Sequence, residues 1–262
     1  MLSNKYKYVV SVGCSFTSSD YEEWDEVFKG VNNLVNPGET YGDVVAEHFG
    51  AKFYNLAKSG GSLQRMNRKT LEWCSKNIDK FKDTLILFGM TGLDRLEIWS
   101  NALYEDCGPG WYNDCHYLQT DPQPPDTFKI DWPLEERKKW FINFYNDNAQ
   151  FFLASNIIIG LQSFLKVNGI DNIFFDAVGT PIDKYWDSYC DDIQDILGHK
   201  LIFDNLVSQE NWYKHPVYES MEEFTEKNKE MSFSKKDVHP NKKAHKYWSE
   251  CLMEFIDEKI NI

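Results

Sequence analysis

The sequence is poor in positive charge. Its 28 lysine and arginine residues stand against 41 aspartate and glutamate residues, which gives a formal charge of −13 and a pI near 4.9. Proteins that bind nucleic acids or anionic membranes need basic patches that replace the counterions of the phosphates. We therefore expect neither nucleic acid nor a membrane as a partner.

Long hydrophobic runs are also scarce. We find no apolar run that approaches the roughly 20 residues needed to span a bilayer. The apolar segment near the amino terminus is shorter than the core of a secretion signal and continues into Gly13 without a small-residue cleavage site. We read this segment as a buried strand and expect a cytoplasmic protein, or a virion-associated one if the source is viral.

The cysteines lack the spacing that is typical of zinc sites and of disulfide frameworks. None of the six cysteines forms a Cys-x-x-Cys pair, so the sequence predicts neither a zinc site nor a disulfide framework, and no cofactor. Free thiols are the simpler interpretation, and a Cys107–Cys115 bridge is the alternative for an exported protein. With no internal repeat or low-complexity tract, we predict a single domain over residues 1–262.

Short apolar runs alternate with longer amphipathic segments along the chain, which is typical of parallel strands joined by helices. The sequence predicts a flavodoxin-like, three-layer α/β/α fold with a central parallel sheet of about five strands. The predicted strands are 6–13, 52–56, 84–89, 170–178 and a weak 200–203. The predicted helices are 41–49, 62–81, 134–167, 187–197 and 240–260.

An aromatic-rich insertion at about 98–133 interrupts this alternation and shows no sustained period. Long irregular loops in compact domains are commonly lids or binding loops. A second stretch, 207–236, mixes aromatic and charged residues. Trp111 and Trp212 are candidate substrate contacts in these two stretches, because indole rings stack on sugar rings. The alternative is a satellite core beneath a long loop.

Polar residues gather where the predicted strands end. Ser15 follows the first strand, Gly60 the second and Thr91 the third, whereas Asp237 and His239 precede the last helix. In a doubly wound sheet, loops at the carboxyl ends of the strands form the ligand-binding crevice. A serine hydroxyl needs a base to become a nucleophile, and His239 is the candidate base, with Asp237 to orient it.

Oxyanion stabilisation has candidates at the same strand ends. The backbone N–H groups of Ser15 and Gly60 and the hydroxyl of Thr91 are the candidate donors to the oxyanion. Arg95, directly after the third block, is a candidate contact for an anionic group of the substrate, or the partner of Glu97 in a surface ion pair.

These blocks resemble the SGNH/GDSL hydrolase superfamily. Gly13-Cys14-Ser15 resembles its Gly-Asp-Ser block, Asn55 to Gly60 the block with the oxyanion glycine, Gly89 to Gly92 the Gly-x-Asn-Asp block, and Asp237 to Pro240 the Asp-x-x-His-Pro block. The resemblance implies a serine esterase or deacylase for a small ester, with an O-acetyl group on a carbohydrate as one candidate substrate. The loosened blocks are similar to those of uncharacterised members encoded by bacteriophages.

The blocks also depart from the family pattern. Cys14 replaces an aspartate, Thr91 stands where the oxyanion asparagine is expected, and Asp237 lies two residues before the histidine instead of three. A threonine hydroxyl donates one hydrogen bond and reaches less far than a carboxamide. Two other functions therefore stay open: a catalytically weak carbohydrate-binding or viral structural module, and a flavodoxin-like nucleotide binder, against which the missing phosphate-binding glycines count.

Several local alternatives stay open as well. Ser62 is a candidate N-cap of the second helix, and Asp237 is a candidate cap of the last helix through Pro240. Metal binding by Asp237, His239 and His245 is disfavoured, because a spacing of six does not place both histidines on one face of a helix.

Overall fold

The computed structural model describes residues 5–18, 35, 38–93, 95–104, 108–114, 143, 147–179, 202–234 and 237–260. Its strands are β1 (Tyr8–Val12), β2 (Lys52–Asn55), β3 (Thr84–Met90), β4 (Leu96–Tyr104), β5 (Gly108–Asp114), β6 (Asp171–Asp176) and β7 (Trp212–Tyr213). Its helices are α1 (Tyr41–Phe49), α2 (Leu63–Lys76), α4 (Asp147–Asn168), α7 (Met221–Lys227) and α8 (Lys242–Ile260), with short 3-10 helices η2 (Ile78–Asp83) and η4 (Lys229–Met231).

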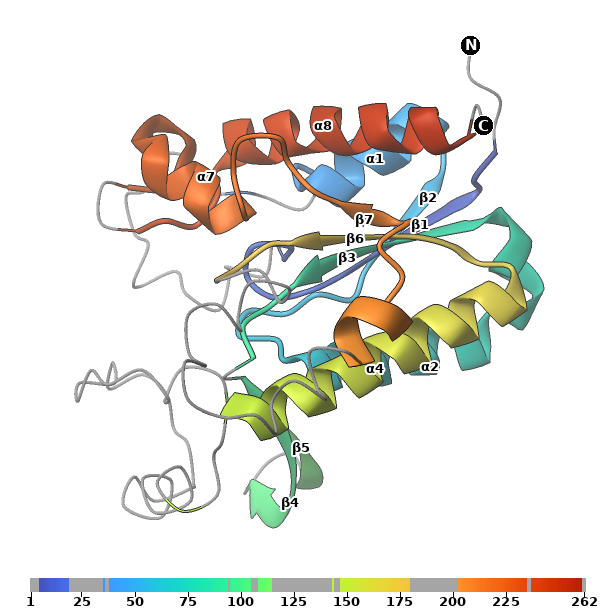
Figure 1. Ribbon diagram of the computed structural model, residues 1–262, viewed down its shortest axis with the longest axis vertical. Coiled ribbons are helices and arrows are strands. Elements are labelled where there is room, and N and C mark those ends of the chain that lie inside the picture. Colours follow the sequence, from blue (N-terminus) through green and yellow to red (C-terminus); the bar gives the residue numbers. More distant parts are fainter. Residues whose placement is uncertain are drawn as a thin grey trace.

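Five parallel strands form the main sheet in the order β2-β1-β3-β6-β7. Helices α1 and α8 cover one face, and α2 and α4 cover the other (Figure 1). This architecture confirms the predicted three-layer α/β/α fold. The strand order reverses between β1 and β3, and the crevice beyond the carboxyl ends of these two strands is where such sheets bind ligands.

The alternation of side chains along the strands explains the two cores. Val10 and Val12 of β1 face the α2 and α4 layer, and Val9 between them faces the α1 and α8 layer. All three are fully buried. A strand that is apolar on both faces is expected in a parallel sheet covered by helices on both sides.

Local signals in the sequence define the helix ends near the site. Thr40 and Asp43 form a capping box at the start of α1, and Gly50 ends that helix in the left-handed conformation with φ of 62°. Ser62 caps α2 by accepting a hydrogen bond from the backbone N–H of Arg65, as predicted. These caps fix where the loops that follow β1 and β2 end.

Helix α4 contains the stretch Ala149–Asn168, which by length and mean hydropathy of 1.3 resembles a membrane span; no other described helix does so. Polar residues such as Asn156 and Gln162 interrupt the apolar residues of this stretch, so it does not form a continuous apolar run in the sequence. In the structure, Phe151, Ile158 and Leu165 of this helix pack into the core against the sheet. The stretch is 39% buried, and Phe152, Leu153 and Val167 on its other side are exposed.

Two predictions of local structure were wrong. Residues 202–206 are helical, and the fifth strand is the two-residue β7 further along the chain. The start of the insertion is an antiparallel hairpin, in which Leu96 of β4 pairs with Asp114 of β5 and Tyr104 with Gly108. Several predictions fall outside the described residues: the rest of the insertion from residue 115 on, the helix at 187–197, and the Cys107–Cys115 bridge. Among the described cysteines, Cys14, Cys74 and Cys251 are free thiols.

Candidate active site

Ser15 lies in a tight turn directly after β1. The carbonyl of Cys14 accepts the backbone N–H groups of Thr17 and Ser18, both at 3.0 Å, so the chain makes one helical turn at this point. Ser15 occupies the first position of that turn. Only 4% of its surface is exposed.

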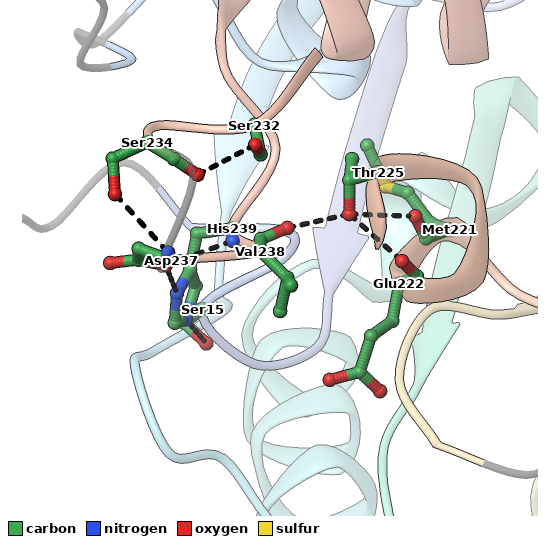
Figure 2. A network of polar contacts seen from close by, with 9 residues as sticks. All are labelled: Ser15, Met221, Glu222, Thr225, Ser232, Ser234, Asp237, Val238 and His239. Carbon is green, nitrogen blue, oxygen red and sulfur yellow. Dashed lines mark hydrogen bonds and ion pairs between the residues drawn. The ribbon is translucent and has the colours of Figure 1, made fainter. Parts of the chain in front are cut away.

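The side chains of Ser15, His239 and Asp237 form a continuous chain of contacts (Figure 2). Nε2 of His239 lies 2.9 Å from Oγ of Ser15, and Nδ1 lies 2.6 Å from Oδ1 of Asp237. A carboxylate only accepts hydrogen bonds, so Nδ1 carries the proton and Nε2 is the acceptor for the serine hydroxyl. The tautomer that the contacts select is the one in which His239 acts as a base toward Ser15.

The Asp237 carboxylate is ionised in this arrangement. Burial opposes its ionisation, but the hydrogen bond and charge of His239, together with the backbone N–H of His239, outweigh burial and hold the pKa of Asp237 below its ordinary value. The same oxygen accepts that backbone N–H at 3.0 Å. Asp237 therefore fixes both the ring and the backbone of His239, and it does not cap α8.

Two phenylalanine rings flank the imidazole of His239. The ring centroid of Phe16 lies 5.0 Å away and that of Phe233 lies 5.9 Å away, at interplanar angles of 35° and 23°. Both phenylalanines are buried. Packing of these two rings against the imidazole restricts its rotation.

Asn241 clamps the segment that carries Asp237 and His239. Its side-chain nitrogen donates to the carbonyls of Glu230 and Ser232, at 2.8 and 3.0 Å. Its side-chain oxygen accepts the backbone N–H groups of Lys243 and Ala244, at 2.9 and 3.2 Å, in the first turn of α8. Asn241 directly follows the Asp237 to Pro240 block in the sequence, and only these contacts reveal its role.

Gly60 lies at the carboxyl end of β2, the strand next to β1. It adopts a φ of 75°, which favours glycine. The next residue, Gly61, packs so closely that a Cβ there would lie 2.6 Å from the carbonyl oxygen of Gly13. The backbone N–H of Lys58 also donates to that carbonyl at 3.3 Å. The loop carrying Gly60 is thus held against the turn that carries Ser15.

Thr91 follows β3 on the other side of β1. Val12 pairs with Phe88 in the register of the sheet, so Ser15 and Thr91 each come three residues after the last paired position. Thr91 is 2% exposed, and its hydroxyl has no hydrogen-bond partner in the described part of the chain. A buried hydroxyl without a partner is unfavourable, unless a ligand supplies the missing contact.

Trp212 is a core residue, contrary to its assignment as a candidate substrate contact. It is 5% exposed, its indole N–H donates to Oδ2 of Asp176 at 3.0 Å, and its ring stacks on Phe174 with centroids 5.5 Å apart. Trp111 lies on β5 with its backbone paired to Trp99, and Arg95 is partly buried just before β4.

His245 does not join the two other candidate metal ligands. It is fully buried on α8, where its Nδ1 accepts the backbone N–H of Tyr41 at 3.2 Å and its ring stacks on that of Tyr41. Within the described ranges, no three histidine, cysteine, aspartate or glutamate side chains gather closely enough to hold a metal ion.

Comparisons with solved structures identify the fold. The psychrotrophic esterase EstA from Pseudoalteromonas sp. is similar with a TM-score of 0.51 and 8% identity, over 98% of this chain and all of that one. The protein TesA gives 0.48 and 10%, and a lipolytic protein of the G-D-S-L family from Veillonella parvula DSM 2008 gives 0.43 and 12%, each over 94% of this chain and 96% of the other. The likeness to EstA, at 8% identity, shows that this chain shares the fold of that esterase.

Sequence comparisons cover the middle of the chain. The model of a family of unknown function, DUF6071, matches residues 29–193. That match includes Gly60 and Thr91 but neither Ser15 nor His239. No curated protein matches the sequence.

Proposed function

The chain belongs to DUF6071, a family whose function is unknown, and we propose that it is a serine esterase in which Ser15 is the nucleophile. The observation that carries this proposal is the continuous contact from Ser15 Oγ through His239 to Asp237, at 2.9 and 2.6 Å. These distances lie within hydrogen-bond reach of a nucleophile and its base.

The proposed reaction proceeds in two halves. His239 Nε2 takes the proton of the Ser15 hydroxyl as its oxygen attacks the ester carbonyl, and the Asp237 carboxylate stabilises the imidazolium that forms. The imidazolium then gives its proton to the leaving alcohol, which produces an acyl-serine. Water, deprotonated by His239, then attacks the acyl-serine, and the imidazolium returns the proton to Ser15 Oγ as the carboxylic acid is released.

Three donors are proposed to stabilise the tetrahedral oxyanion. They are the backbone N–H groups of Ser15 and Gly60 and the hydroxyl of Thr91. The buried, unpartnered state of the Thr91 hydroxyl supports this role, because an oxyanion would supply its missing partner.

The burial of the nucleophile bears on the substrate. Ser15 is 4% exposed and lies between Cys14 and Phe16, which are buried as well. We propose a small acyl group such as acetyl for this reason. The proposed alcohol is a carbohydrate, because the insertion at 98–133 is rich in tryptophan and tyrosine, whose rings suit contacts with sugars.

Covalent labelling tests the nucleophile. A fluorophosphonate probe is expected to attach once per chain, at Ser15, because only a serine activated by a base attacks phosphorus rapidly. Peptide mass spectrometry locates the probe. Ser15→Ala should abolish labelling. Ser155→Ala should not, although it removes a buried hydroxyl on α4 that has no hydrogen-bond partner among the described residues. Absence of labelling, or labelling at another residue, contradicts the proposal.

The Thr91 hydroxyl is expected to contribute to the rate and little to substrate binding. Thr91→Val should lower kcat for p-nitrophenyl acetate by about 10- to 100-fold with KM nearly unchanged, somewhat below the usual loss for an oxyanion donor because a threonine reaches less far than an asparagine. Thr91→Ser retains the hydroxyl and serves as the control. Steady-state kinetics that give the same kcat for Thr91→Val and wild type would remove Thr91 from the oxyanion hole.

A further inference from the structure

Thr225 of α7 is fully buried and lies against the segment that carries the base. Its hydroxyl is 2.5 Å from the carbonyl oxygen of Val238, and 3.2 and 3.0 Å from those of Met221 and Glu222 in its own helix (Figure 2). A hydroxyl has one proton to donate. The shortest contact assigns that proton to Val238, outside the helix.

The carbonyl of Val238 belongs to the peptide group that joins Val238 to His239. The other end of this peptide, the N–H of His239, donates to Oδ1 of Asp237 at 3.0 Å. The peptide is therefore held at both ends, by Thr225 and by Asp237. Because a peptide group is planar, fixing its two ends restricts the direction in which the Cα–Cβ bond of His239 leaves the backbone.

Helix α7 is in turn attached to the carboxyl end of the sheet. The backbone N–H of Glu222 donates to the carbonyl of Ala177 at 3.0 Å, and the Glu222 carboxylate accepts the N–H of Gly179 at 2.6 Å. Met221 and Phe224 pack into the core on the α1 and α8 face. A continuous set of contacts thus leads from the end of β6 through α7 to the backbone of His239.

We propose that Thr225 is a positioning residue for the general base, an inference that rests on the proposed esterase function. It does not touch the substrate. Its hydroxyl holds the peptide before His239 so that Nε2 remains within reach of Ser15 Oγ. Neither helical periodicity nor any of the catalytic blocks marks Thr225 in the sequence, because its partner lies 13 residues further along the chain.

The test removes the hydroxyl with little change in shape. Thr225→Val should lower kcat by about 10- to 100-fold and leave KM within about two-fold, because misplacement of a catalytic group by about 1 Å costs up to about 10²-fold. Thr225→Ser restores the donor and should recover kcat to within about three-fold of wild type. All rates are expressed per active site titrated with the fluorophosphonate, so that unfolded protein does not count.

Thr70→Val on α2 is the matched control. Thr70 is also a buried helical threonine, and its hydroxyl donates to the carbonyl of Met66 in the same helix, at 2.8 Å. Its replacement costs stability of the same kind without touching the base, so kcat should stay within about two-fold of wild type.

The outcomes separate this inference from the proposed function. If wild-type protein is not labelled at Ser15, the esterase proposal fails. If labelling occurs and Thr225→Val keeps kcat within two-fold, the positioning role is overturned while the esterase proposal stands. If the valine variant does not fold, Thr225→Ala removes the hydroxyl in its place. If the kcat of Thr225→Ser is as low as that of the valine or alanine variant, the positioning role is also overturned.

Discussion

Replacing Ser15 by alanine is expected to lower kcat for p-nitrophenyl acetate by about 10⁴-fold or more. The remaining rate is expected to exceed that of the uncatalysed reaction only by the acceleration that substrate binding and the oxyanion donors provide. The reason is that the covalent path disappears. His239 and Asp237 remain in place in this variant, but the base has lost the hydroxyl that lies 2.9 Å from it in the wild type, so it can only activate water.

Steady-state kinetics measure the loss, and circular dichroism checks that the variant is folded. Ser155→Ala is again the control, since Ser155 is as deeply buried as Ser15 and its hydroxyl has no partner in the described structure. Full activity in Ser15→Ala would show that another residue carries the reaction. If the wild-type protein hydrolyses no substrate but binds acetylated glycans, the results would favour the binding module over the enzyme.

The central strands could be predicted because they are buried on both faces. Each gives a short apolar run bounded by turn residues, and the runs at β1, β3 and β6 cannot be amphipathic helices. The run at 200–203 has the same composition, yet residues 202–206 are helical, and Phe203 packs against Phe151 of α4. Periodicity does not distinguish a strand from a buried helix over four residues.

The fifth strand of the sheet, β7, could not be predicted for a different reason. β7 has only two residues, Trp212 and Tyr213. They form a strand because their backbone pairs with the free edge of β6, and not because of a strand pattern in their own sequence. The aromatic character that suggested a substrate contact for Trp212 reflects burial against Phe174. A tryptophan in an irregular stretch does not reveal from sequence which side of the loop it faces.

The catalytic candidates were accessible to sequence reasoning for a topological reason. Ser15, Gly60 and Thr91 follow three adjacent parallel strands, and the carboxyl ends of parallel strands meet at one edge whatever the length of the helices between them. Their supports were not accessible in this way. Thr225, Phe233 and Asn241 act through contacts that depend on how the segment before α8 folds back on α7, and no strand order fixes that path.

Stability is expected to fall as pH is lowered from about 6.5 to about 3, because of His245. Burial lowers the pKa of His245 from 6.5 to about 3, and its Nε2 has no hydrogen-bond partner among the described residues. Between these values the unfolded chain binds a proton that the folded chain excludes, so the stability is present above pH 6.5 and is lost as pH falls. One proton of difference corresponds to about 1.4 kcal/mol of unfolding free energy per pH unit.

His245→Asn isolates this contribution from that of the carboxylates, which titrate in both proteins. An asparagine oxygen can take the place of Nδ1 as the acceptor for the Tyr41 backbone N–H, and its side chain does not titrate. Urea denaturation at several pH values between 4 and 7 should give a variant that is less stable near pH 7, because it leaves a cavity, but that loses stability less steeply toward acid. Parallel pH profiles for the two proteins would mean that His245 takes up a proton in the folded state, which requires an acceptor or water at Nε2.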